Sequence, residues 1–235
     1  MNRSRLAITL AGIVLLAGCA APLQSTTATA PDSEETTVVT TGTGSVEADA
    51  DLAVVRVAVV SVADTAEAAR NDTASRSTAL VDALVAAGVP EDAITTASYS
   101  LNAQYDRDNG ERELAGYRAV HTYHVEVAPD EAGTAIDAAV SEAGAEVRGV
   151  EFTLTPETRA DLRAEAVENA VANARADADA AAAAAGLNVT RVVSIEVGST
   201  PVFASRGLET ADAATELRPG PVTVEATVTV TYRAE

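Results

Sequence analysis

The unbroken alternation VTVEATVTVTY near the C-terminus is the feature that most constrains how this 235-residue chain folds. Successive side chains of a β-strand point to opposite faces, so the segment predicts a strand with one apolar face and one threonine-rich face. We expect another strand at residues 189–197, shortly before it. The apolar face of the last strand carries Val222, Val224, Ala226, Val228, Val230 and Tyr232.

A long alanine-rich helix is predicted before these two strands. Thr155 provides a cap, Pro156 a proline at the first helical position and Glu157 an acid in the first turn, while Gly186 closes the segment. At 1.5 Å per residue the helix would be roughly 45 Å long. Because such a helix outruns a small sheet, we expect part of its apolar stripe to pack against another subunit. The predicted stripe comprises Leu162, Val167, Ala170, Val171, Ala174 and Ala178.

The middle of the chain predicts a split β-α-β arrangement. Strand-like runs flank Asp49 and Asp51, and a helix follows that Asp64 or Thr65 can cap. This helix ends at Gly88 and carries Ala68, Leu80 and Leu84 at helical spacing. Residues 94–105 predict a strand, residues 130–143 a second helix, and VRGVEFTL a short strand.

Residues 52–154 therefore have the order β-α-β-β-α-β, which is typical of a ferredoxin-like sheet with helices on one face. The predicted fold class is α+β: an antiparallel sheet with this split arrangement, the long C-terminal helix and two further strands.

A turn at Asn109-Gly110 raises a question of register. A strict two-residue turn would pair Tyr99 with Val120, so that the apolar face of one strand meets the mixed face of the next. We therefore predict a bulge or a longer loop between residues 106 and 116. The shifted register places Tyr99 and Leu101 on one face with Tyr117, Tyr123 and Val125.

The composition argues against a nucleic-acid partner and indicates a salt-rich environment. Aromatic residues make up only 3% of the chain, so the core must be built from Val, Ala, Leu and Ile. The formal net charge is −19, and every basic residue is arginine. An acidic surface without lysine is typical of salt-loving organisms, in which salt screens its self-repulsion. Such a surface repels phosphate backbones, so we expect no nucleic-acid partner.

The N-terminus predicts export and lipidation. Two arginines precede the apolar segment 6–17, which is too short to span a bilayer, and LLAGC resembles a lipobox. We interpret residues 1–18 as a signal peptide, 19–37 as a lipid-anchored Ser/Thr-rich linker and 38–235 as the folded domain. Lipid on Cys19 would hold the domain on the outer, extracytoplasmic face of the cell membrane. The alternative is an ordinary signal peptide with an incidental cysteine. Asn71 and Asn188 begin N-glycosylation sequons.

The motif HTYH holds both histidines of the chain. On a strand His121 and His124 point to opposite faces and cannot hold one ion together. His124 and Glu126 could bind a metal weakly, but no third ligand is visible. GTGS lacks the lysine of a phosphate-binding loop, and there is no Gly-x-Ser-x-Gly motif. We therefore predict no catalytic residues, no metal and no cofactor, and hence no enzyme.

Several strings in order resemble the SIMPL-domain family, a domain of unknown function. They are GTGSVEADADLAVVRVAV, which resembles the family's opening hairpin, VDALVAAGVPEDAITTASYSL, GYRAVHTYHVEV, AGAEVRGVEFTL and ELRPGPVTVEATVTVTY, and they cover residues 39–232. The chain departs from the family at His121 and Glu146, where asparagine is common. The family has no established catalytic residues to carry over. The resemblance implies a self-assembling envelope protein, with some members linked to oxidative-stress resistance.

The function expected from these observations is a non-enzymatic lipoprotein that forms homo-oligomers and supports envelope or oxidative-stress tolerance. One alternative is an extracytoplasmic module that binds a small ligand or cation in a cleft formed by residues 199–221. Another is a hydrolase, for which the folded chain would have to bring a nucleophile and a base together.

Overall fold

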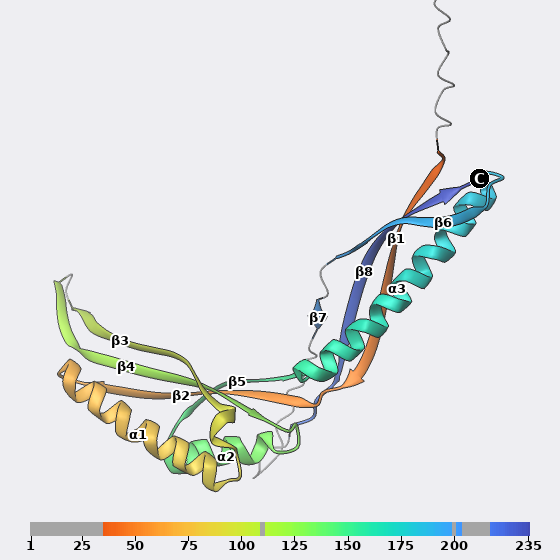
Figure 1. The fold of residues 1–235 in the computed structure, drawn as a ribbon. Helices are drawn as coiled ribbons and strands as arrows, with labels where there is room; N and C mark the ends of the chain where they lie inside the picture. Colours follow the sequence, from red (N-terminus) through yellow and green to blue (C-terminus); the bar gives the residue numbers. More distant parts are fainter. Residues whose placement is uncertain (1–34, 109–110, 199–200, 204–216) are drawn as a thin grey trace, which may run out of the picture. The chain divides into compact units, whose positions relative to one another are not determined.

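The strands form two antiparallel sheets of four strands each (Figure 1). The computed structural model describes residues 35–108, 111–198, 201–203 and 217–235, and all statements on structure refer to these. The ferredoxin-like sheet has the order β3-β4-β2-β5, formed by β3 (Ile94–Asp108), β4 (Glu111–Val127), β2 (Leu52–Ala63) and β5 (Glu146–Thr153). The second sheet contains β1 (Thr37–Asp49), β8 (Pro221–Ala234) and β6 (Val189–Val197) in that order, with β7 (Val202–Phe203) also paired to β8.

Two helices cover one face of the ferredoxin-like sheet, as the split β-α-β pattern predicted (Figure 1). They are α1 (Ala66–Ala86) and α2 (Ala132–Ala143), and a short 3₁₀ turn, Glu91–Ala93, leads into β3. Thr65 caps α1, its hydroxyl accepting a hydrogen bond from the backbone N–H of Ala68 at 3.2 Å. The α+β fold class is confirmed. The core combines side chains of both layers, including Val55, Val57, Val59, Leu80, Leu84, Val125, Ile136 and Phe152.

The contact face of α1 differs from the prediction at one position. Leu80 and Leu84 are buried, but Ala68 is exposed and Ala69 is buried in its place. Counting back from Leu80 toward the start of α1, the buried residues recur at the helical period, and they are small or polar. The buried residues of α1 are Ala69, Thr73, Ser77, Leu80 and Leu84.

The predicted opening hairpin is wrong, because β1 and β2 belong to different sheets. β1 pairs along its whole length with β8, whereas β2 pairs with β4 and β5. The connection between them leads from the second sheet into the ferredoxin-like sheet, and it contains Asp51. Its carboxylate accepts hydrogen bonds from the Thr155 backbone N–H at 2.6 Å and from the hydroxyls of Thr155 and Thr158. Asp51 thereby caps the long helix α3 (Pro156–Ala184).

The register of the β3–β4 hairpin confirms the predicted bulge. The pairing shifts between Gln104 and Tyr105, opposite Gly116 and Leu114, so one extra residue lies in β4. Tyr99 consequently faces His121, and Leu101 faces Ala119. The turn residues 109–110 lie outside the described part of the chain.

The α3 helix packs on its own sheet along most of its length. Ala170, Ala174 and Ala178 are buried as predicted, whereas Leu162, Val167 and Val171 only flank the stripe. The fully buried stripe is Ala166, Ala170, Ala174, Ala178 and Ala182. The expectation that α3 outruns its sheet is therefore wrong, because β1 and β8 cover these alanines. Among the described residues no helix has the length and apolar content needed to cross a membrane.

Candidate functional site

The two histidines lie on opposite faces of β4, as the strand period predicted. His121 lies on the face that packs against α1, where Ser77 contacts it. His124 lies on the other face, where its Nε2 accepts a hydrogen bond of 3.2 Å from Nε of Arg56. The two imidazoles therefore have separate surroundings and separate chemistry.

His121 is the centre of a group of hydroxyl-bearing side chains, here the His121 cluster. Its Nδ1 lies 3.1 Å from Oγ of Ser77 and 2.9 Å from the hydroxyl of Tyr123, and its Nε2 lies 3.0 Å from Oγ1 of Thr96. The ring of Tyr99 stands edge-on to the imidazole with centroids 5.4 Å apart, and that of Tyr123 lies at 4.2 Å. Burial lowers the pKa of His121 below its ordinary value of 6.5.

Ser77 and His121 form the nucleophile–base pair that the hydrolase hypothesis required. However, Ser77 is buried beneath α1, with only 6% of its surface exposed. Nδ1 of His121 is shared with the hydroxyl of Tyr123, and the contacts described for the imidazole include no carboxylate to orient it. A triad needs both an open approach to the nucleophile and an oriented base, so the geometry favours a role in packing.

His124, one of the two candidate metal ligands together with Glu126, has a cation beside it. Arg56 directs its guanidinium at the His124 nitrogen that would bind a metal. In the described residues no three His, Cys, Asp or Glu side chains come together in a way that could hold an ion. That no metal is bound stays a prediction.

The GTGS string has a structural role that sequence reasoning missed. A Cβ atom on Gly42 would overlap the carbonyl oxygen of Ala170, and one on Gly44 would overlap that of Ala166. Only glycine allows the backbone of α3 to approach β1 so closely. Thr40 adds a hydrogen bond of 2.7 Å from its hydroxyl to the carbonyl of Ala174.

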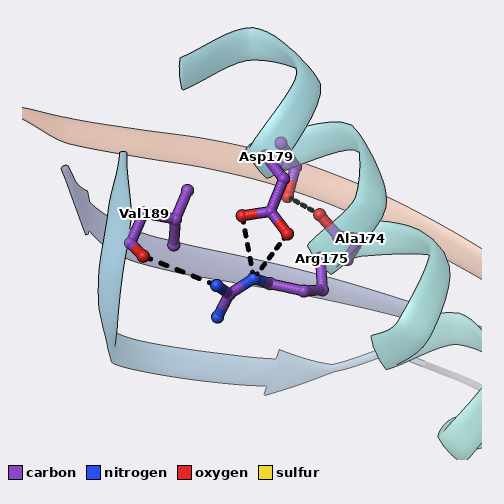
Figure 2. Close-up of polar contacts among 5 residues, drawn as sticks. Ala174, Arg175, Asp179 and Val189 are labelled. Atoms are coloured by element: carbon purple, nitrogen blue, oxygen red, sulfur yellow. Dashed lines mark hydrogen bonds and ion pairs between the residues drawn. The ribbon is translucent and has the colours of Figure 1, made fainter. Parts of the chain in front are cut away.

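A surface arginine links the C-terminal half of α3 to the sheet. Figure 2 shows Nε of Arg175 between the two carboxylate oxygens of Asp179, at 3.0 and 2.9 Å. Its Nη2 reaches the carbonyl of Val189 at 3.5 Å, and the guanidinium lies 5.6 Å from the ring centre of Tyr232. Hydrogen bonding to Asp179 raises the pKa of Arg175, and burial raises the pKa of Tyr232.

Strand β6 exposes an apolar surface. Pairing places Val192, Ile195 and Val197 opposite Tyr232, Val230 and Val228 of β8, hence on the face that α3 covers elsewhere. Here α3 leaves them about half exposed, and Val193 is equally open, with exposed fractions of 45–50% for the four side chains. The pattern VVSIEV predicts a strand, but the exposure of its side chains depends on where α3 lies.

The remaining predicted residues fall in different places. Cys19 lies outside the described residues, as does most of the proposed cleft segment 199–221. Asn71 is exposed on α1, but the threonine of its sequon, Thr73, is fully buried. Asn188, just before β6, is exposed, and Thr190 of the same sequon is also exposed. A hollow at the end of α1 and the start of α2 is lined by Ala87, Gly88, Val89, Glu131, Thr134 and Ala135.

Comparison with known proteins gives a family match and relatives of undescribed function. The family model described as "SIMPL: Protein of unknown function (DUF541)" matches residues 38–232. The chain is similar to "Uncharacterized protein YggE" of Edwardsiella ictaluri, at 31% identity over 169 residues, 70% of this chain and 69% of the relative. It is also similar to "Uncharacterized protein YggE" of Escherichia coli K12, at 29% identity over 137 residues, 57% of this chain. The alignment spans 56% of that Escherichia coli relative, little more than half of its length. Because the family model matches most of the chain, including both sheets, this protein belongs to the SIMPL family.

Proposed function

We propose that this SIMPL-family protein is a non-enzymatic lipoprotein of the cell envelope. Lipid on Cys19 holds it on the outer face of the cell membrane, and the folded domain associates with further copies of itself. In this form it supports tolerance of envelope or oxidative stress. The lipobox-like LLAGC and the linker at residues 19–37 support the anchoring.

The single observation that carries self-association is the exposed apolar edge formed by β6. Exposed apolar edge strands are templates for pairing with another chain, and natural proteins usually protect them with charge or cover. β6 instead presents four half-exposed aliphatic side chains beside only two charged ones, Arg191 and Glu196. In the described part of the chain β6 pairs with β8 alone, so its outer edge is open to a partner.

The polar clusters support a non-enzymatic role. Asp51 is used to cap α3, and the Ser77 hydroxyl is covered by the helix that carries it. The imidazole of His124 accepts a hydrogen bond from an arginine. Each of these groups thus has a partner within the fold rather than standing free to meet a substrate.

Size-exclusion chromatography with light scattering tests the self-association. The full chain, purified from membranes in detergent and run in high salt, should have a protein mass above that of one chain. Ile195→Glu places a charge on the β6 edge and should return it to a monomer. Val85→Glu, at an equally exposed valine of α1, is the matched control and should leave the mass unchanged. A clean monomer of the wild type at micromolar concentration would remove the proposal.

Membrane fractionation tests the anchor. The wild type should be found with the membranes and carry lipid on Cys19 by mass spectrometry, whereas Cys19→Ser should lose the lipid. Mature protein in the medium with an unmodified thiol would rule the anchor out.

The physiological part is tested with a deletion strain challenged by oxidants and by envelope stress. We expect sensitivity that the wild-type gene restores and the Ile195→Glu gene does not. A deletion strain that grows like its parent under every challenge would contradict this part.

A further inference from the structure

The two N-glycosylation sequons of the chain lie in different kinds of backbone. Asn71 and Thr73 belong to helix α1, whereas Asn188 and Thr190 lie where the chain enters β6. Glycosylation needs the asparagine amide and the hydroxyl two residues later to be reachable together, and modified sequons therefore lie on the surface. The local backbone decides whether both groups can be reached from one side.

In α1 these two groups point in opposite directions. Side chains two residues apart on a helix are separated by about 200° around its axis, so they do not share a face. Asn71 is exposed, and its side-chain oxygen accepts a hydrogen bond of 2.8 Å from Nη2 of Arg70. Thr73 is fully buried, and its hydroxyl donates to the carbonyl oxygen of Ala69 at 2.8 Å. A transferase could reach Thr73 only by unwinding this part of α1.

At Asn188 the backbone is extended and paired with the end of the chain. The Asn188 N–H donates to the carbonyl oxygen of Glu235 at 2.7 Å, and the Asn188 carbonyl accepts from the Glu235 N–H at 3.0 Å. Val189, the middle residue of the sequon, pairs with the buried Ala234 and packs against the core under α3. Its two neighbours, Asn188 and Thr190, therefore lie together on the opposite face of the sheet, and both are exposed.

Both groups of this second sequon remain available. In the part of the chain that the structure describes, the Asn188 side chain makes no hydrogen bond. The Thr190 hydroxyl donates one hydrogen bond of 3.3 Å to the carbonyl of Arg233, and its oxygen can still accept another. Because α3 packs on the other face of this sheet, a bulky group on Asn188 would not meet that helix.

We propose that the protein carries an N-linked glycan on Asn188 and none on Asn71. This modification requires the export in the proposed function, but neither the lipid anchor nor self-association. It is compatible with association through β6, because Val192, Ile195 and Val197 lie on the α3 face and a glycan on Asn188 would not cover them.

The sugar donor is an oligosaccharide linked through phosphate to a polyprenyl lipid. The amide nitrogen of Asn188 forms a bond to the anomeric carbon of the first sugar, and the bond from that carbon to the phosphate oxygen breaks. The lipid phosphate leaves with the electron pair of that bond. The amide proton passes to a base of the transferase, and nothing is oxidised or reduced.

Peptide mass spectrometry tests this modification on the full chain, purified from membranes of the organism that produces it. Trypsin cleaves after arginine and releases residues 71–76 and residues 176–191, each with one of the two sequons. We expect the 176–191 peptide to carry an added mass that yields sugar fragments. The 71–76 peptide should have its unmodified mass.

Variants produced in the same organism connect the added mass to the sequon. Asn188→Gln and Thr190→Ala should each abolish it, whereas Thr190→Ser keeps the hydroxyl and should retain it. Asn71→Gln is the matched control and should leave the glycan on the 176–191 peptide. All three positions are exposed, so these substitutions should preserve the fold.

Three outcomes would overturn the assignment: an unmodified 176–191 peptide, a glycan on the 71–76 peptide, or an added mass that persists in Thr190→Ala. The N-terminal peptide separates this failure from that of the proposed function. If the chain begins at Cys19 and the 176–191 peptide is unmodified, export holds and the assignment alone is wrong. If residues 1–18 are still present and the 176–191 peptide is unmodified, export fails and the assignment fails with it.

Discussion

The helices α1 and α3 both cover an antiparallel sheet, but they do so by opposite means. α3 lays five alanines, one at every fourth residue, on its sheet, and two glycines of β1 let the backbones touch between Ala166 and Ala174. α1 divides its contact between two leucines at one end and hydroxyls with an imidazole at the other. Because the alanine contact of α3 repeats along the helix, we expect α3 to separate from its sheet as one unit. The more weakly packed half of α1, by contrast, can open by itself.

The largest effect is expected at the glycines of β1. The double variant Gly42→Ala with Gly44→Ala forces two methyl groups into the backbone of α3 and should lower the free energy of unfolding by about 6 kcal/mol, since overpacking costs up to about 3 kcal/mol at each site. Denaturant unfolding in high salt measures it. Thr43→Ala, between them on the exposed face, should change stability by less than about 0.5 kcal/mol. Equal effects of the double glycine variant and of Thr43→Ala would contradict the close approach of α3 to β1.

A smaller effect should separate the two halves of α1. Leu84→Ala leaves a cavity in the ferredoxin-like core and should cost about 3 kcal/mol, whereas Ser77→Ala should cost about 1 kcal/mol. The same unfolding experiment compares them. If Ser77→Ala were as damaging as Leu84→Ala, the contact of α1 would not be divided as described.

The capping carboxylate of α3 gives the next effect. Asp51→Ala removes the acceptor of the Thr155 and Thr158 donors and should cost about 1–2 kcal/mol at pH 7. Burial alone would raise the pKa of Asp51, but hydrogen bonds from Thr158 and Thr155 bring it below 3.8. Its contribution is therefore complete above pH 3.8 and disappears as the pH falls through the folded-state pKa.

Unfolding curves between pH 7 and pH 2 should show the wild type approaching the stability of Asp51→Ala in acid. Asp49→Ala, an exposed carboxylate two residues earlier, is the control and should follow the wild type throughout. A constant difference between wild type and Asp51→Ala down to pH 2 would contradict the assignment.

The smallest effect is expected at the surface ion pair of α3. Arg175 and Asp179 are each about half exposed, and such pairs contribute at most about 1 kcal/mol. Asp179→Ala should therefore lower stability by less than about 0.5 kcal/mol in molar salt, where charges are screened. A larger loss would mean that the arginine, rather than the alanine stripe, positions this end of the helix.

Local patterns in the sequence predicted most elements of this fold. The two-residue period of β8 and the cap residues of α3 act over a few positions, and so does the face-matching argument that required a bulge near Gly116. The pairing of β1 with β8 was not predicted, because it joins residues nearly two hundred positions apart and leaves no local signal. The assumed hairpin followed only from the proximity of two strands in sequence.

The His121 cluster could be predicted only in part. The strand period placed His121 and His124 on opposite faces, but nothing in the sequence indicated that Ser77 would meet the imidazole. The helical spacing from Leu80 back to Ser77 and Thr73 was the available signal. It was missed because small polar residues do not stand out as a helix contact face.

Cross-linking in intact cells measures whether this domain associates with itself on the cell envelope through β6. Cys19 is the only cysteine, and lipid would occupy it, so Val193→Cys introduces a single free thiol on the exposed edge. Val85→Cys, similarly exposed on α1, is the control. We expect a disulfide-linked dimer in the membrane fraction for Val193→Cys and a monomer for Val85→Cys. Monomers of both variants, or equal dimers of both, would contradict it.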